Sequence, residues 1–172
     1  MENNPHRFSL GSNRTSDCTS KRFAIENNLA GRITKLVYGI IKNGQAINEK
    51  AIPKTHFGIM AGRQLPSGEL VDEVMANETT GSDNAPGFHA VQGSMGLDAG
   101  KSPTFGYYVG PAAKITAKAG GKTVTAKHAT WSEDPSVVVF WFSPSVSGVG
   151  KLAAFNSAGK QLPTGNSGVG VG

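Results

Sequence analysis

The residues best suited to acid–base or ligand chemistry lie in one long polar segment, residues 77–104. The segment is rich in Gly, Ser, Asn, Asp and Pro, and it places His89 between Asp83 and Asp98. An imidazole near a carboxylate can exchange protons or hold a polar ligand, and long irregular segments in compact domains often carry function. Asp83, His89 and Asp98 are therefore a candidate loop site, and a hydrolase with its site in this loop is one function to consider.

No established catalytic or metal-binding motif surrounds these residues. The four histidines are far apart, and none has the spacing of a zinc site. No serine lies in a Gly-x-Ser-x-Gly motif, and a single cysteine, Cys18, excludes an intramolecular disulfide and a multi-cysteine zinc site. We therefore expect no enzyme activity, no cofactor and no bound metal.

A second candidate site lies on a predicted β-hairpin that turns at residues 120–121. Both turn residues are glycines, which adopt the positive φ of a tight two-residue loop at little cost. This turn fixes which residues of the two strands face each other. The predicted pairs are Ala119 with Lys122, Ala117 with Val124, Ile115 with Ala126, and Ala113 with His128.

Opposed residues share a face of the sheet, so the pairing predicts an apolar face and a Lys/Thr face. The Lys/Thr face carries Lys114, Lys118 and Lys127, with Lys122 at the turn. Such a surface suits a polyanion, and a cytosolic nucleic-acid-binding module is a further alternative function. No aromatic residue lies among these lysines to stack on bases, so a solvated face that discourages aggregation is the simpler interpretation. Nucleic acid is therefore not the expected partner.

Elsewhere the sequence has the patterns of strands and turns. Val137–Phe142 is a continuous apolar run between two prolines, which is typical of a strand buried on both faces. Leu152–Phe155 and Lys160–Leu162 predict a closing hairpin, and Phe88–Val91 is the one strand expected within the long loop. The fold class predicted is all-β, an antiparallel β-sandwich of about seven to nine strands with a general immunoglobulin-like architecture.

The chain divides into three parts by composition. Residues 1–20 are a polar tail without the apolar core of a signal peptide, residues 21–162 form a single β-sandwich domain with its long loop, and residues 163–172 are a Gly-rich tail. The longest apolar run is too short to cross a membrane. The net charge of +5 is spread over the chain and gathers in no basic cluster.

The segment Phe105–Leu162 resembles a recurrent kind of uncharacterised actinobacterial extracytoplasmic β domain. The resemblance is carried by FGYYVGPAAKITAKAGGKTVTAKHATW, by SVVVFWF and by LAAFNSAGKQL. Such domains occur in lipoproteins and in the outer segments of membrane proteins. The resemblance implies the all-β fold and an extracellular or cell-surface location. We predict a non-catalytic binding or structural role there, with a protein or an anionic surface polymer as partner. It carries over no functional residues.

Overall fold

The described part of the chain is built from β-strands. The structure, a computed structural model, describes residues 23–29, 32–42, 57–67, 70–78, 82–97, 100–131 and 134–170, which contain strands and turns but no helix. No helical segment long and apolar enough to cross a membrane occurs within these ranges. The strands are β1 (Phe23–Leu29), β2 (Arg32–Lys42), β3 (Phe57–Gln64), β4 (Leu70–Asn77), β5 (Gly87–Gln92), β6 (Gly96–Leu97), β7 (Gly100–Lys101), β8 (Phe105–Val109), β9 (Lys114–Ala119), β10 (Lys122–Thr125), β11 (Lys127–Thr130), β12 (Val137–Trp141) and β13 (Gly150–Phe155).

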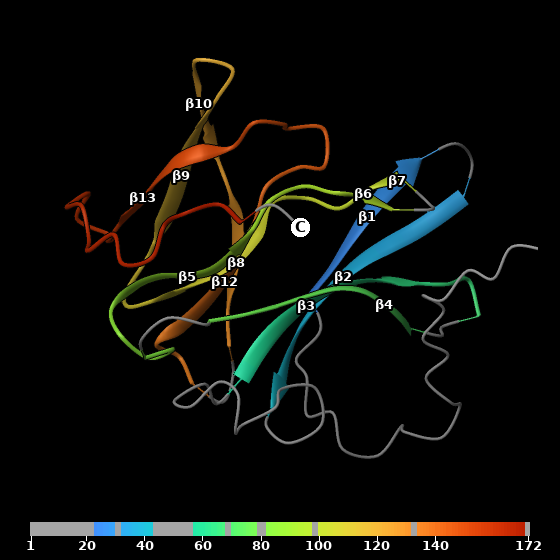
Figure 1. Cartoon of the computed structure of the whole chain (residues 1–172), viewed down its shortest axis with the longest axis horizontal. Coiled ribbons are helices and arrows are strands. Elements are labelled where there is room, and N and C mark those ends of the chain that lie inside the picture. Colours follow the sequence, from blue (N-terminus) through green and yellow to red (C-terminus); the bar gives the residue numbers. More distant parts are fainter. Residues whose placement is uncertain are drawn as a thin grey trace, which may run out of the picture.

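These strands form three larger sheets and one short ribbon. The central sheet has the order β11-β12-β8-β5, the N-terminal sheet the order β1-β2-β3-β4, and the hairpin sheet the order β10-β9-β13. β6 and β7 make the ribbon. Figure 1 shows the central sheet between the N-terminal sheet, in blue to green, and the hairpin sheet. The prediction of an all-β antiparallel fold is confirmed for the described residues.

The two inner strands of the central sheet, β8 and β12, are buried on both faces, which explains why they are apolar without alternation. On one face Tyr107 packs in a core shared with the N-terminal sheet, and its ring centroid lies 4.9 Å from that of Phe57. On the other face Tyr108 and Phe140 pack in a second core with Ile115 of the hairpin sheet. Every residue of β12 is buried. The predicted strand covered on both faces is therefore confirmed.

The hairpin predicted at residues 120–121 is confirmed close to its turn. β9 and β10 pair in the predicted register, with Ala117 opposite Val124. The backbone N–H of Ala126 then donates to the carbonyl of Ile115 at 2.9 Å. Both turn glycines have positive φ, as a two-residue loop of this kind requires.

The hairpin ends sooner than the sequence indicates. After Ala126 the chain leaves the hairpin sheet, and β11 pairs with β12 of the central sheet. The predicted pair of Ala113 and His128 is therefore wrong, and His128 is exposed on an edge strand instead of lying on an apolar face. Ala126 is buried at this crossing, and strands commonly change sheets in this way at the corners of packed sheets.

The C-terminal segment, residues 163–170, lies along β5 in parallel orientation as an additional edge. Phe88 forms a bridge with Gly165, and Gln92 forms one with Gly170. The N–H of Asn166 donates to the carbonyl of Phe88 at 2.8 Å, and the N–H of Gly170 donates to a β5 carbonyl at the same distance. The segment thus lies along the edge of β5, one of the two outermost strands of the central sheet.

The residues just before this segment join it to the hairpin sheet. β13 is followed by a tight turn, and the N–H of Leu162 donates back to the carbonyl of Ala154 at 2.9 Å. Leu162 and Val169 both pack against the core between the central and hairpin sheets. The predicted closing hairpin is confirmed, and the chain that follows it covers one side of this core.

The parallel contact requires glycine at two facing positions. A Cβ on Gly87 would lie 2.4 Å from the Cα of Gly165, and a Cβ on Gly165 would lie 2.8 Å from the Cα of Gly87. Both residues have positive φ, +131° and +56°. By contrast, a Cβ on Gly168 would meet only a side-chain oxygen of Asn166, at 3.7 Å.

These contacts predict a sharp difference between two alanine substitutions in the C-terminal segment. Gly165→Ala should lower the free energy of unfolding by about 2 kcal/mol or more, because the new methyl group clashes with the β5 backbone and the φ is strained. Gly168→Ala, the matched control, should change it by less than about 0.5 kcal/mol. Urea unfolding followed by tryptophan fluorescence measures both, and equal effects would contradict the close packing.

Candidate functional site

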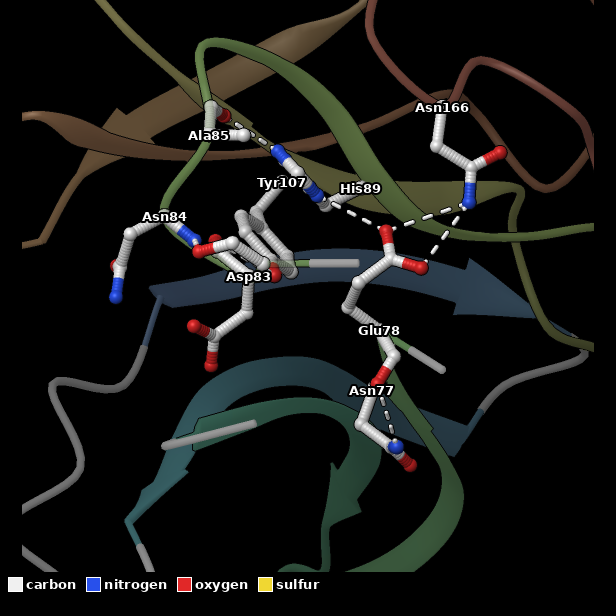
Figure 2. Close-up of polar contacts among 9 residues, drawn as sticks. Asn77, Glu78, Asp83, Asn84, Ala85, His89, Tyr107 and Asn166 are labelled. Atoms are coloured by element: carbon white, nitrogen blue, oxygen red, sulfur yellow. Dashed lines mark hydrogen bonds and ion pairs between the residues drawn. The ribbon is translucent and has the colours of Figure 1, made fainter. Parts of the chain in front are cut away.

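The candidate site is built around Glu78, the residue that follows β4. Its side chain is 1% exposed. Burying a carboxylate costs several kcal/mol unless hydrogen-bond donors replace the lost water. Donors come from His89 of β5, the next strand along the chain, and from Asn166 of the C-terminal segment, 88 positions away (Figure 2).

His89 is held at both ring nitrogens. Its Nδ1 lies 2.9 Å from Oε2 of Glu78, and its Nε2 lies 2.6 Å from the backbone carbonyl oxygen of Ala85. A carbonyl only accepts hydrogen bonds, so Nε2 carries a proton. One further proton must lie between Nδ1 and the carboxylate, because two acceptors would repel each other. The imidazole therefore has neither nitrogen directed to solvent.

Asn166 completes the arrangement from the opposite side of the carboxylate. Its Nδ2 lies 3.1 Å from Oε1 and 3.3 Å from Oε2 of Glu78. The amide of Asn77 donates in turn to the backbone carbonyl of Glu78 at 3.2 Å. Figure 2 shows the three polar side chains converging on Glu78 from β4, β5 and the C-terminal segment.

Tyr107 of β8 forms the wall behind His89. The two rings are stacked, with centroids 5.1 Å apart and planes 14° from parallel. The Tyr107 hydroxyl donates to the backbone carbonyl of Asp83 at 3.1 Å. Burial raises the pKa of Tyr107 well above its usual range, and the negative charges of Asp83 and Glu78 raise it further. The hydroxyl thus stays protonated and serves to fix the turn at residues 82–86.

A β-bulge in β5 sets the directions of the side chains. The register of β5 against β8 shifts between His89 and Gln92, and Ala90 has a φ of 46° although it is not glycine. The additional residue allows Phe88 and Val91 to enter the same core, while His89 faces Tyr107 on the other side of the sheet. Bulges of this kind often redirect side chains next to functional sites.

An open pocket of about 320 Å³ lies beside Glu78, between β4, the end of β5 and the C-terminal segment. Polar and backbone groups line much of it, and Met75 contributes an apolar side chain that is 55% exposed. Its polar side chains are those of Asn77, Glu78, Gln92 and Asn166. A second hollow, of about 450 Å³, lies beside Lys114 and the turn after β13, but no buried polar side chain lines it.

The structure brings together two members of the predicted loop site. Asp83 and His89 are both buried beside Tyr107, but the Asp83 carboxylate points away from His89 (Figure 2). The acid that His89 contacts is Glu78. Asp98 lies outside the described residues. No cluster of three His, Cys, Asp or Glu side chains that could bind a metal occurs in the described part of the chain.

The structure does not bring the four predicted lysines onto one surface. Lys114 and Lys118 are exposed on β9, where Lys118 Nζ donates to Oγ1 of Thr123 at 2.6 Å, and Lys122 is exposed at the turn. Lys127 belongs to the central sheet and lies opposite Trp141. Because opposed residues share a face, Lys127 is on the side of the N-terminal sheet and apart from the other three.

Sequence reasoning missed Glu78 and Asn166, which complete the site. Glu78 lies at the start of the polar segment 77–104, 11 positions before His89, and Asn166 is in a Gly-rich stretch with no apolar periodicity. The one available signal was the density of glycines in that stretch, since glycine permits a close approach of two backbones. Comparison of the chain with protein-family models, curated proteins and solved structures found no match.

The two buried tyrosines predict a loss of stability at high pH. Burial raises the pKa values of Tyr107 and Tyr108 above 10.0 in the folded chain. Below pH 10 both states keep these protons. Above pH 10 the unfolded chain releases them first, so stability should fall by up to about 1.4 kcal/mol per pH unit for Tyr107, whose pKa is raised most, and by less for Tyr108. Urea unfolding at pH 9 and pH 11 measures the change, and Tyr107→Phe should reduce it. An unchanged pH dependence in Tyr107→Phe would contradict the assignment.

The bulge predicts an unusual response to glycine. Ala90→Gly should stabilise the protein by about 0.5 kcal/mol, because glycine adopts positive φ without strain. Ala129→Gly, in β11, should instead destabilise it by about 1 kcal/mol, the usual effect of glycine in a strand. Thermal unfolding compares the two variants, and the same sign for both would show that Ala90 is not strained.

Proposed function

We propose that the protein is a non-catalytic binding domain whose ligand site is the pocket beside Glu78. The observation that supports this most strongly is a buried carboxylate in the pocket wall, fixed by His89 and Asn166 from either side. Ligand sites are typically concave and contain a few polar groups in fixed positions. Here three separate segments of the chain hold those groups, so the pocket exists only in the folded protein.

The hydrolase alternative is less well supported by the same contacts. A general base needs a nitrogen within reach of substrate, and both nitrogens of His89 are occupied by Glu78 and the carbonyl of Ala85. The described residues that line the pocket contain no Ser, Thr, Cys, Lys or His. Recognition of a ligand, not its cleavage, is the chemistry that this lining favours.

The alternative of nucleic-acid binding is less well supported, because the four lysines do not form one continuous cationic surface. Lys127 lies on a different face from Lys114 and Lys118, Lys122 is opposite Ala119 at the turn, and Lys118 is hydrogen-bonded to a threonine. Phosphate recognition gains its strength from several cations acting along one path. The exposed lysines are therefore better interpreted as solvated residues of a sheet face.

We also propose an immunoglobulin-like sandwich architecture and a location for the protein. We interpret the central sheet and the hairpin sheet as the two layers of an immunoglobulin-like sandwich, with the N-terminal sheet packed on its outer face. The support is the shared core of Tyr108, Phe140 and Ile115 between the two layers. Together with the resemblance over residues 105–162, this favours an extracellular or cell-surface domain that binds a protein or a surface polymer.

The proposal is tested by looking for ligands at the pocket. Amide NMR spectra would be recorded with separate amines, sugars, amino acids and carboxylic acids at millimolar concentration, and at least one class should shift Asn77, Gln92 and Gly168 together. Gly168→Leu should abolish the shifts, because its side chain occupies the pocket, whereas Gly168→Ala should retain them. A panel in which no class shifts these residues, or a hydrolytic turnover lost in Glu78→Gln, would contradict the proposal.

A further inference from the structure

We propose that the pocket beside Glu78 takes an extended peptide, which pairs as an additional strand with the free edge of β4. This inference rests on the proposed function and adds the chemical class of the ligand. It is drawn from the unpaired edge of β4, from the extent of the two packed layers at the pocket and from the glycines that form one of its walls.

One edge of β4 has no partner strand. β4 is the last strand of the N-terminal sheet, and among the described strands it pairs only with β3. In an antiparallel pair, every second residue of an edge strand directs its N–H and C=O groups away from its neighbour. Within the described part of the chain, residues 75–77 make no backbone hydrogen bond outside the sheet. At least one of these three residues therefore offers both groups to a further strand.

The pocket lies at this edge of β4 and not on one of its faces. Successive side chains of a strand point to opposite faces, so a pocket on one face would be lined by alternate residues. Here the consecutive residues 75–78 all line the pocket. Their backbone extends over about 13 Å, at about 3.3 Å per residue, so a peptide strand of similar length can lie beside them.

The layer that packs against the N-terminal sheet extends one strand beyond β4. Where the two layers meet, β3 approaches β8 and β4 approaches β5. The C-terminal segment lies along the outer edge of β5. The position next to β4 is therefore opposite the C-terminal segment, and the pocket lies between the two. A peptide paired with β4 would cover this segment in the same way that β4 covers β5.

Glycines leave space for the backbone of such a peptide. Gly168 and Gly170 line the pocket, while Val169 between them packs into the core on the other side of the segment. Among the described residues, a Cβ on Gly168 would meet only the side-chain oxygen of Asn166, at 3.7 Å, so the fold itself does not require glycine there. Glycine in an extended segment often marks a place where another backbone approaches closely.

Met75 predicts which side chain the peptide carries. It lies opposite Met60 of β3, so both methionines are on the same face of the N-terminal sheet. Met75 is the one large apolar side chain among the described residues that is mostly exposed, at 55%. A residue of the added strand that lies opposite Met75 would be on this face too, and the flexible thioether can pack against it. An apolar residue is therefore preferred at that position of the peptide.

The test uses the peptide acetyl-Lys-Thr-Val-Thr-Leu-Thr-Lys-amide as the probe. The control peptide has the same sequence with N-methyl groups on the central Thr and the Val before it. These groups remove one donor from each edge of the extended peptide and keep every side chain. In titrations at pH 7 followed by amide NMR, the probe should shift Ala76, Asn77 and Gly168. The control should bind about ten-fold more weakly, because it loses a strand hydrogen bond.

Hydrogen exchange in the complex identifies the mode of binding. The N–H groups of residues 75–77 that face away from β3 should exchange about ten-fold more slowly, because they gain a strand partner, and those bonded to β3 should change little. Met75→Asn should weaken probe binding about two- to five-fold through lost cross-strand packing, whereas Met75→Leu, the matched control, should retain it. Gly168→Leu should abolish binding, because its side chain occupies the pocket.

The outcomes separate the two proposals. If the probe and its N-methylated control bind equally, or if the probe slows no exchange in β4, strand addition is wrong. The binding pocket itself still stands in that case if a small molecule shifts Asn77, Gln92 and Gly168. If neither the probe nor any small molecule shifts the pocket residues, both proposals are wrong.

Discussion

The carboxylate of Glu78 lies away from bulk water, so the protein itself must supply its hydrogen-bond donors. His89 and Asn166 supply them, and these residues are separated from Glu78 by 11 and 88 positions in the chain. The requirement couples the end of β4, the bulged strand β5 and the C-terminal segment. If any one of the three moved away, a buried charge would lose a partner, and the pocket between them would open.

The rigid element behind this arrangement is the central sheet. Its inner strands, β8 and β12, have a core on each face, so their side chains are fixed by packing from both directions. Tyr107 connects this packed sheet to the site. Its ring stacks on His89, and its hydroxyl is hydrogen-bonded to the turn that contains Ala85. The polar site is thus held by strands whose two faces are packed, one against the N-terminal sheet and the other against the hairpin sheet. Neither of these sheets alone could cover both faces.

The sequence was informative where one segment determines its own structure. The glycines at 120–121 predicted a turn and its register, and the run Val137–Phe142 predicted a strand buried on both faces, because both patterns are local. The point at which Ala126 changes sheets could not be read in this way, since the alternation of residues continues through it. Asp83 and His89 were found from composition, whereas Glu78 and Asn166 depend on contacts between distant segments.

The C-terminal segment shows why a glycine-rich stretch need not be an unpacked tail. It has few side chains to bury, but its backbone supplies hydrogen bonds to β5, and Gly165 permits an approach that any side chain would prevent. The segment has no apolar periodicity because it is rich in glycine. The same lack of side chains allows its backbone to pack against β5. Because Asn166 follows Gly165 directly, the same close approach brings the amide to Glu78. The docking of the segment and the completion of the pocket are one structural event.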